Sequence, residues 1–302
     1  MKIGIDIGGS HIGTGMILEN GKLVGKETRD INFSEIDDEK RVEEIILETI
    51  KMEIQTLLER YNYGVEDISQ IGLAVPGSPT KTSIKNMVNL HITNFNIAEK
   101  LNRIYNTKIT LRNDGKCAGL AEKKYGVLKK YDDCIFLCIG TGVGTAVFYD
   151  GDLLVPKNNP GFEFGHMIIK KGGKKCNCGN NGCFETYASM KKFKEDVIKK
   201  FNLPKNSQSE EIQNFIRKNI SKSDVKKFVD DYLDNVAVGI SNIINIFEPQ
   251  AICFGGSFSY YDDIFLELLN KKVKQYVFNK DSNFILLSAK LKNDAGIIGA
   301  VL

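Results

Sequence analysis

The first thirty residues alternate between apolar runs and turn-forming residues. Segment 2–7 (KIGIDI) predicts a buried strand, a glycine-rich turn follows at 8–13, and apolar residues resume at 14–19. An Asn-Gly pair at Asn20–Gly21 favours a tight hairpin and leads into a third strand at 23–28. We therefore expect three consecutive strands at the start of the chain.

Segment 134–155 repeats this pattern. An apolar strand at 134–139 (CIFLCI) runs into the glycine turn 140–144, a strand at 145–149, an Asp-Gly turn and a strand at 152–155. The second copy is slightly shorter than the first and hardly shares residue identity with it. We interpret this as a weak duplication that gives two related α/β halves.

Elsewhere the apolar spacing changes to the period of a helix. It predicts helices over 38–61 and 225–247, the second ended by Pro249. The small residues of 293–302 predict a closing helix. Segment 199–224 is polar and predicts an irregular surface excursion.

Composition narrows the class of protein. The 302 residues are 42% hydrophobic and 26% charged, as in ordinary globular proteins, and the net charge of +3 is too small for a nucleic-acid surface. No apolar run is long enough for a membrane span, and the first residues do not resemble a signal peptide. We expect a cytoplasmic protein whose thiols stay reduced, with no nucleic-acid or membrane partner.

Three strands end in glycine turns. Without a Cβ, backbone N–H groups at such turns can approach an anion closely. For each turn alone a plain hairpin is the more common explanation, and none fits the P-loop or dinucleotide patterns. Together they favour a nucleotide held between two lobes. The turn residues are Gly8, Gly9, Ser10 and His11, then Gly140, Thr141, Gly142 and Gly144, then Gly255 and Gly256.

Carboxylates stand beside two predicted strand ends. Asp6 precedes the first turn and suits Mg²⁺ or a metal-bound water, or else accepts a hydrogen bond at the strand end. Asn113 and Asp114 precede a helix that ends near Gly126. Asp114 is either an N-cap or a general base kept ionised by the helix dipole, and spacing alone does not decide between the two.

Three cysteines crowd the segment KKCNCGNNGCFET. Cys176, Cys178 and Cys183 can reach one ion because Gly179 and Gly182 let the chain wrap. His166 can supply a fourth ligand, and three thiolates with one imidazole form a structural zinc site.

Two glutamates flank this predicted zinc loop. Glu163 precedes His166, and Glu185 follows the last cysteine. We expect the ion to hold these carboxylates near one another, where they accept hydrogen bonds from the hydroxyls of a polyol or sugar. The alternative is that both are ordinary surface charges.

From residue 3 to its end the chain resembles the ROK family of repressors, open reading frames and sugar kinases. The most specific segment is the cysteine loop with the preceding GFEFGHM. The other segments that carry the resemblance are DIGGSHI, GLAVPGS, the NL of VNLHITNF, RNDGKCAGLAE, IGTGVGTAV, EPQAICFGGSF and NDAGIIGA.

The resemblance implies an α/β, actin-like ATPase (ribonuclease H-like) fold, with two lobes around a central cleft that closes over ATP and a hexose. We place the smaller lobe at 1–115, with the helix at about 292–302 returning to it. The larger lobe is 116–291 and carries the zinc loop.

The resemblance also assigns roles. Asp114 is the base for the sugar 6-hydroxyl, and the turns at 8–11 and 140–144 hold the phosphates of ATP with Mg²⁺. Gly255–Gly256 borders the adenosine. The residues for the other hydroxyls are Asn113, Glu163, His166 and Glu185, with His166 also on zinc.

The expected activity is an ATP-dependent hexose kinase, with glucose as the default sugar and N-acetylmannosamine, mannose, fructose and allose as alternatives. His11 stands where family members often have lysine, which leaves open how the phosphates are neutralised. A sugar-sensing regulator would carry a DNA-binding module before the first strand, and none is expected here. A catalytically dead sugar-binding scaffold would be expected to have lost Asp114. A homodimer is expected because the family commonly forms one.

Overall fold

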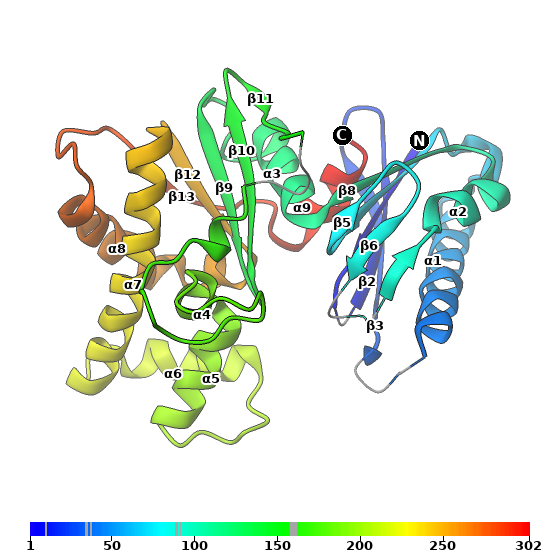
Figure 1. Ribbon diagram of the computed structural model, residues 1–302. Helices are drawn as coiled ribbons and strands as arrows, with labels where there is room; N and C mark the ends of the chain where they lie inside the picture. Colours follow the sequence, from blue (N-terminus) through cyan, green and yellow to red (C-terminus); the bar gives the residue numbers. More distant parts are fainter. Residues whose placement is uncertain (10, 34–35, 37, 88–89, 91, 158–161) are drawn as a thin grey trace. The chain divides into compact units, whose positions relative to one another are not determined.

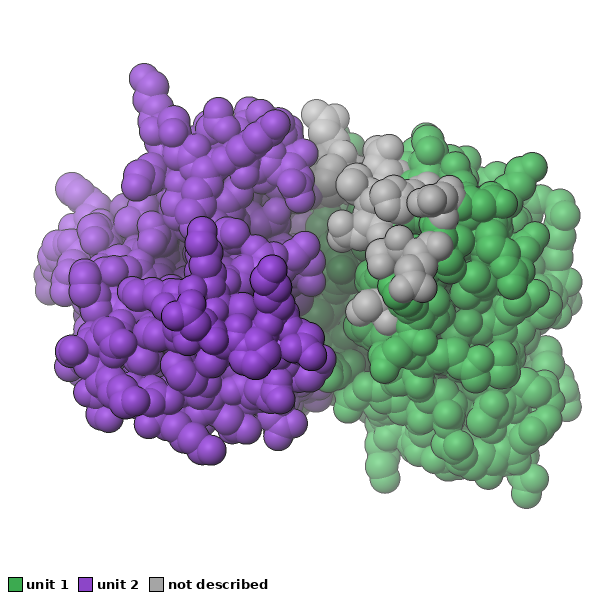
Figure 2. Space-filling view, turned by 90° about the horizontal axis from the view of Figure 1, so that it is seen from below, with its two compact units in different colours: residues 1–126, 155–161, 293–302 green, residues 127–154, 162–292 purple. Residues whose placement is uncertain are grey.

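The computed structural model (Figure 1) describes the chain except for residues 10, 34–35, 37, 88–89, 91 and 158–161. The chain forms two compact units, coloured green and purple in Figure 2. The first contains residues 1–126, 155–161 and 293–302, and the second contains residues 127–154 and 162–292.

A five-stranded mixed sheet organises the first unit. Its order is β3-β2-β1-β4-β8. The pairs β3–β2 and β2–β1 are antiparallel, and the pairs β1–β4 and β4–β8 are parallel. The meander predicted from the opening residues is confirmed, although β2 begins at His11 rather than at residue 14. The strands are β1 (Lys2–Ile7), β2 (His11–Ile17), β3 (Leu23–Asp30), β4 (Gln70–Val75) and β8 (Lys108–Asn113).

The second unit is organised by a sheet of the same plan. Its order is β11-β10-β9-β12-β13, and the pattern of antiparallel and parallel pairs matches that of the first sheet. The weak duplication seen in the sequence is therefore a duplication of topology. The strands are β9 (Cys134–Ile139), β10 (Val143–Tyr149), β11 (Asp152–Leu153), β12 (Ala251–Gly255) and β13 (Ile285–Ser288).

Helices cover both sheets. The long helix α1 begins after Asp38, whose side chain accepts a hydrogen bond from Lys40 N at 2.9 Å, and ends at Asn62 in the left-handed conformation. The helices of the first unit are α1 (Glu39–Tyr61), α2 (Ile97–Tyr105), α3 (Asp114–Tyr125) and α9 (Ala295–Ala300). Those of the second are α4 (Glu185–Ala188), α5 (Met190–Lys200), α6 (Ser209–Asn219), α7 (Ser223–Phe247) and α8 (Asp262–Tyr276).

Short elements complete the two units. A small antiparallel sheet in the first unit is formed by β5 (Ser78–Pro79), β6 (Ile84–Met87) and β7 (Ile92–Phe95). Single 3₁₀ turns are η2 (Val65–Asp67), η4 (Phe164–His166), η5 (Gly256–Tyr261) and η6 (Lys292–Asp294).

The C-terminal helix α9 packs directly on the main chain of the first sheet. A Cβ built on Gly4 of β1 would lie 2.0 Å from Ile297 O, and one on Gly72 of β4 would lie 2.0 Å from Ala300 O. A Cβ on Gly299 would lie 1.7 Å from Cys117 O of α3. The helix α9 packs on both the sheet and α3, so α3 belongs to the first compact unit. This unit continues to Gly126 rather than ending at residue 115.

The polar segment 199–224 is not the irregular excursion that its composition predicts, and that interpretation is wrong. It contains α6 and the start of α7. Ile212 and Ile216 are one helical turn apart and fully buried, so they attach α6 to the core of the second unit. Three apolar residues, Ile212, Phe215 and Ile216, among many polar ones give too weak a periodicity to identify the helix from sequence.

The long apolar helix α7 carries much of the core of the second unit. Val236, Ile240 and Ile243 are fully buried, at helical spacing, in the same core as the strands β9 and β12. Among the helices within the described part of the chain, none combines the length and apolar character needed to cross a bilayer.

A buried carboxylate lies between α1 and the first sheet. Glu53 is 4% exposed and accepts a hydrogen bond from Thr14 Oγ1 at 2.6 Å through Oε2, whereas its Oε1 has no hydrogen-bond partner. Burial raises the pKa of Glu53 to about 7, although the Thr14 bond and nearby Arg29 act in the opposite direction.

We predict that Glu53→Gln stabilises the protein at alkaline pH. The unfolded carboxyl ionises near 4.5 and the folded one near 7, so the folded state holds more protons between these values and stability falls as pH rises through them. The amide keeps an acceptor for Thr14 but carries no charge. Glu53→Gln changes the free energy of unfolding, which urea denaturation measures. We expect this change to be about 1–3 kcal/mol more stabilising at pH 8 than at pH 5.

The control for this measurement is Glu59→Gln, on the exposed side of the same helix. Its difference from wild type should be the same at both pH values. An equal effect of Glu53→Gln at pH 5 and pH 8 would contradict the buried-charge explanation.

Candidate functional site

Asp6 and Asp114 bring two carboxylates together in the first unit. Burial, together with the charge of Asp114, raises the pKa of Asp6 to about 7, while Lys26 opposes the shift. The Asp6 carboxylate packs on α9, since a Cβ on Gly296 would lie 2.2 Å from its Oδ2. A partly buried carboxylate beside a second one is a favourable place for a divalent cation with oxygen ligands.

At the junction of β8 and α3, one residue caps the helix and the next one presents an exposed carboxylate. Asn113 is the N-cap, and its Oδ1 accepts a hydrogen bond from Lys116 N at 3.3 Å. Asp114 is the first residue of the helix and is exposed, with Oδ1 accepting from Gly115 N at 2.7 Å. Capping is therefore a role of Asn113, and Asp114 presents a carboxylate at the positive end of the helix dipole.

The first glycine turn is closed by its own main chain. Gly8 N donates to His11 O at 2.8 Å, and the His11 imidazole lies so close to Gly8 that a Cβ there would be 2.6 Å from Cε1. Gly9 is exposed. Ser10, which sequence analysis places in this turn, lies outside the described residues.

The second and third glycine turns are adjacent in the second unit. Gly140 N donates to Gly142 O at 2.9 Å, and Lys191 N of α5 donates to Gly140 O at 3.2 Å. Gly256 has a φ of +67°, and a Cβ there would lie 2.7 Å from Ile139 O, so only glycine allows the two turns to touch.

A cavity of about 290 Å³ opens beside these two turns. Buried Ile212 and partly buried Ile198 give it an apolar wall, while serines and lysines supply polar groups. Burial lowers the pKa of Lys194, and its Nζ donates to Ser209 Oγ at 2.7 Å. The cavity is lined by Gly140, Thr141, Lys191, Lys194, Glu195, Ile198, Ser207, Ile212 and Ser257.

Lys191 and Lys194 are residues that sequence analysis misses. They lie on the amphipathic helix α5, where lysines three residues apart are usually a solvated face. Only the contact of α5 with the glycine turn at Gly140 brings them to the cavity.

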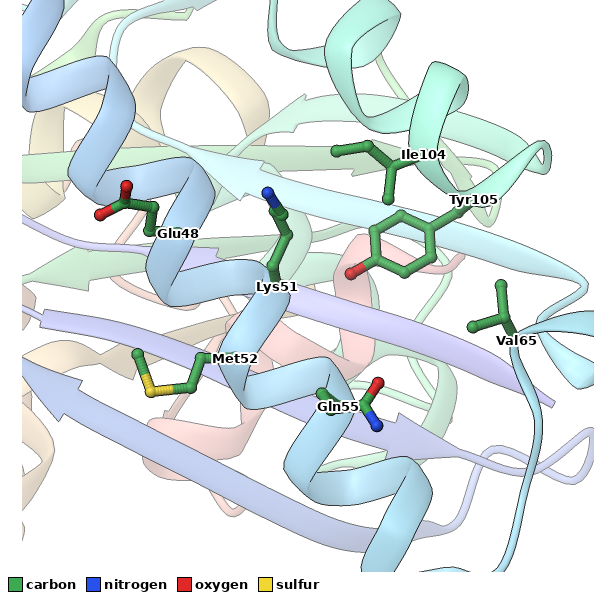
Figure 3. Close-up of a pocket in the computed structure, with 7 residues that line it drawn as sticks. All are labelled: Glu48, Lys51, Met52, Gln55, Val65, Ile104 and Tyr105. Carbon is green, nitrogen blue, oxygen red and sulfur yellow. The ribbon is translucent and has the colours of Figure 1, made fainter.

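A larger cavity, of about 510 Å³, lies on α1 and α2 in the first unit (Figure 3). It is lined by Glu48, Lys51, Met52, Gln55, Val65, Ile104 and Tyr105, and burial raises the pKa of Tyr105 to about 12. None of the site residues predicted from the sequence borders it.

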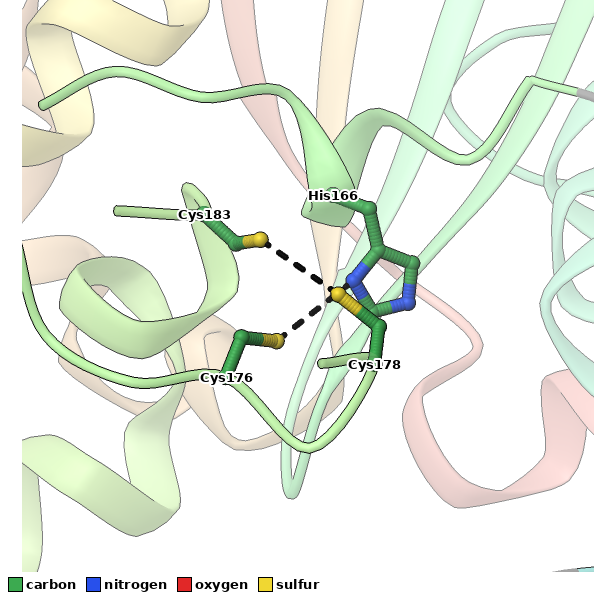
Figure 4. A group of neighbouring side chains, drawn as sticks. All are labelled: His166, Cys176, Cys178 and Cys183. Carbon is green, nitrogen blue, oxygen red and sulfur yellow. Dashed lines mark hydrogen bonds between the residues drawn. The ribbon is translucent and has the colours of Figure 1, made fainter. Parts of the chain in front are cut away.

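The cysteine loop folds His166 and three thiols around one point (Figure 4). All four ligand atoms lie within 4.8 Å of one another. Cys176 Sγ is 3.7 Å from His166 Nδ1, and the Sγ atoms of Cys178 and Cys183 are 3.6 Å apart. A tetrahedral ion with metal–sulfur bonds of about 2.3 Å holds its ligand atoms about 3.7 Å apart, so the set fits such an ion.

The main chain of this loop explains the convergence. Ile168 and Cys183 form an antiparallel bridge, and Phe184 N donates to Met167 O at 2.7 Å. Gly179 and Gly182 have φ values of +93° and +84°, which let the loop reverse within a few residues. The predicted metal-ligand set is therefore brought together by the fold.

Glu185 connects this loop to the second glycine turn. Its Oε2 accepts a hydrogen bond from Val143 N at 2.9 Å, and a Cβ on Gly142 would lie 2.6 Å from the same oxygen. Glu185 also lies near Gly165, where a Cβ would be 3.5 Å from Glu185 Cβ. Glu163 is exposed, and its carbonyl accepts from His166 N at 2.9 Å.

The site residues predicted from sequence thus form two groups, each within one unit. Asp6, Asn113, Asp114 and the first turn belong to the first unit. The second and third turns, Glu163, Glu185 and the metal ligands belong to the second.

Comparison with known proteins gives a match along nearly the whole chain. The model of the ROK family matches residues 2–302. The chain is 27% identical to the glucokinase of Thermotoga maritima, over 99% of this chain and 95% of that protein. It is also 27% identical to the xylose repressor of Bacillus subtilis, over 99% of this chain and 75% of that protein.

Solved structures show the same fold. A ROK family glucokinase from Streptomyces griseus, in complex with glucose and AMPPNP, superposes with a TM-score of 0.84 at 21% identity, over 99% of this chain and 97% of that one. A ROK family transcriptional regulator, a homolog of the E. coli MLC protein, also gives 0.84, at 19% identity, over 99% of this chain and 76% of that one.

Proposed function

The chain belongs to the ROK family and has its actin-like ATPase fold, and we propose that it is an ATP-dependent hexose kinase acting on the 6-hydroxyl, with glucose as the preferred sugar. The observation that carries the proposal is the exposed carboxylate of Asp114 at the start of α3, beside partly buried Asp6. The glucokinase relatives support the same class of reaction.

Asp114 is the general base in this proposal. It takes the proton of the sugar 6-hydroxyl while that oxygen attacks the γ-phosphorus of ATP, and the bond from phosphorus to the bridging oxygen breaks to release ADP. The helix dipole favours the ionised form of Asp114, because the N-terminus of α3 carries partial positive charge. Asn113 fixes the helix start and offers its amide to another sugar hydroxyl.

The nucleotide binds through glycine turns and the cavity beside them. The turns at 8–11 and 140–144 offer backbone N–H groups to the phosphates, and Gly255–Gly256 borders the adenosine. Lys191 and Lys194 add positive charge at the mouth of the cavity, next to Gly140. Asp6 would hold Mg²⁺, directly or through water, and the ion would neutralise the phosphates.

The remaining sugar contacts come from the second unit. Glu163, His166 and Glu185 accept or donate hydrogen bonds at the other hydroxyls. Mannose, fructose, allose and N-acetylmannosamine are the alternative substrates, because these residue types suit any hexose.

The cysteine loop suits structural zinc. Three thiolates and the Nδ1 of His166 match the tetrahedral ligand preference of Zn²⁺ and leave no coordination position for a substrate. With His166 bound through Nδ1, its other ring nitrogen is free to face the sugar. The ion would stabilise the loop that carries both His166 and Glu185.

A second candidate function is a sugar-sensing regulator, favoured by the match to xylose repressors over 99% of this chain. Such a protein binds a sugar without turning over ATP. A coupled assay of ADP release across a panel of hexoses and N-acetylhexosamines separates the two functions. Sugar-dependent ADP release supports the kinase, and sugar binding without any ADP release supports the regulator.

We predict that Asp114→Asn lowers kcat for the preferred hexose by about 10²–10⁴-fold, the usual contribution of a positioned base. The shape at the helix start is kept and Asn113 remains the cap, so the melting temperature and the affinity for ATP should change little. Asn113→Ala is the comparison, since losing the cap should cost about 1 kcal/mol of stability. Near-wild-type kcat in folded Asp114→Asn protein would refute the assigned mechanism.

We predict one zinc ion per chain in protein purified without chelator, measured by elemental analysis. Cys178→Ser should lose the zinc and lower both the melting temperature and the sugar affinity, because binding and folding of the loop are coupled. Cys178 is exposed, so lost packing does not explain such a change. Cys138→Ser, outside the cluster, should keep its zinc, and zinc-free wild-type protein of full activity would contradict the assignment.

We predict that Lys194→Met raises KM for ATP by about 3–10-fold, because a partly desolvated ammonium beside phosphates contributes more than one in water. Methionine keeps most of the aliphatic length and packing of the lysine side chain, and KM for the sugar should not change. Lys199→Met, on the exposed face of α5, is the matched control. Equal KM values for ATP in the two variants would remove Lys194 from the nucleotide site.

A further inference from the structure

The carboxylate of Glu185 occupies part of the glycine turn that is proposed to hold phosphate. Its Oε2 accepts from Val143 N at 2.9 Å and packs on the Cα of Gly142, where any Cβ would collide with it at 2.6 Å. Gly142 ends the turn between β9 and β10, Val143 is the first residue of β10, and Glu185 belongs to the same compact unit. A side-chain anion therefore uses an N–H group at the edge of a turn that is proposed to bind an anion.

This contact has an electrostatic consequence for nucleotide binding. A carboxylate and a phosphate oxygen compete for the same donors, and two negative charges a few ångströms apart repel each other in a partly buried site. Glu185 is half-buried, so solvent screens that repulsion only in part. With Glu185 on Val143 N, the turn is a poorer phosphate site than its sequence suggests.

In the proposed function Glu185 also contacts the sugar, so a bound sugar can change the hydrogen bonding of this carboxylate. It stands two positions after Cys183, a member of the cluster with His166, and its backbone is fixed by the loop that ends at the Phe184–Met167 hydrogen bond. The carboxylate can rotate while the backbone stays fixed. Sugar hydroxyls are donors that compete with Val143 N for its oxygens.

We propose that Glu185 couples the two ligand sites, an inference that rests on the proposed hexose kinase function. Without sugar, the carboxylate stays on Val143 N and weakens binding of the nucleotide phosphates. Hydroxyls of a bound hexose draw it away, the turn becomes available, and nucleotide binds more tightly after the sugar. By linkage, nucleotide strengthens sugar binding by the same factor. The device limits ATP binding, and with it hydrolysis by water, when no sugar is present.

The test is the affinity for Mg·AMPPNP in the absence of sugar, measured by isothermal titration. Glu185→Ala removes the competing anion, and Glu185→Gln keeps an acceptor for Val143 N but removes the charge. Both should bind the nucleotide more tightly than wild type, by about 3–10-fold for alanine and at least about 2-fold for glutamine. Glu267→Gln, which removes an exposed carboxylate on α8 of the same unit, is the control and should match wild type.

A second titration with saturating glucose, or the preferred hexose of the panel, completes the design. The sugar should tighten nucleotide binding to wild type and to Glu267→Gln, and this gain should be reduced in the Glu185→Gln variant. Glutamine keeps the bond to the turn, so this variant is informative even if the alanine variant fails to fold.

The outcomes test the coupling role of Glu185 and the proposed kinase function separately. Sugar-free nucleotide affinity equal to or weaker than that of wild type in the Glu185 variants overturns the coupling role and leaves the kinase function intact. No binding of Mg·AMPPNP by wild-type protein, with or without any sugar of the panel, refutes the proposed function itself.

Discussion

Main chain packed directly against main chain is the contact on which both units depend. In the first unit, α9 lies on β1, β4 and α3 at distances that Gly4, Gly72 and Gly299 alone permit. In the second, Gly256 brings the third turn onto the end of β9. These approaches hold the chain terminus to the sheet and place two glycine turns side by side. A single methyl group at any of these positions would force backbone to move, which costs far more than a surface substitution.

Ionisable side chains lie close together near the ends of the strands that these contacts hold in place. Asp6 is partly buried next to Asp114, three thiols face one imidazole, and Glu185 accepts a hydrogen bond from the backbone beside a glycine turn. The Asp6–Asp114 pair has a cost in the protein alone, because it brings like charges together and desolvates one of them. A bound cation would relieve that cost.

Many of these features could be predicted from patterns in the sequence, and each exception has a physical cause. The strands of the two meanders, the helices α1 and α7 and the metal-ligand set were predicted because each depends on residues close in sequence. The helix α6 was missed because only Ile212 and Ile216 mark its buried face. The boundary at Gly126 and the position of Lys194 were missed because α3 and α5 take their places from contacts with α9 and with Gly140.

The sequence by itself determined the local elements, the duplicated meander and the ligands of the cysteine loop, since periodicity, glycine turns and ligand chemistry act over short stretches of chain. Tertiary structure alone decided that Asn113 is the cap and Asp114 the exposed carboxylate, and that Asp6 lies partly buried beside it. It alone placed Glu185 on Val143 N, across 42 residues of sequence. Burial and hydrogen bonding between distant segments set the state of these carboxylates, and no pattern in the linear chain records which segments will meet.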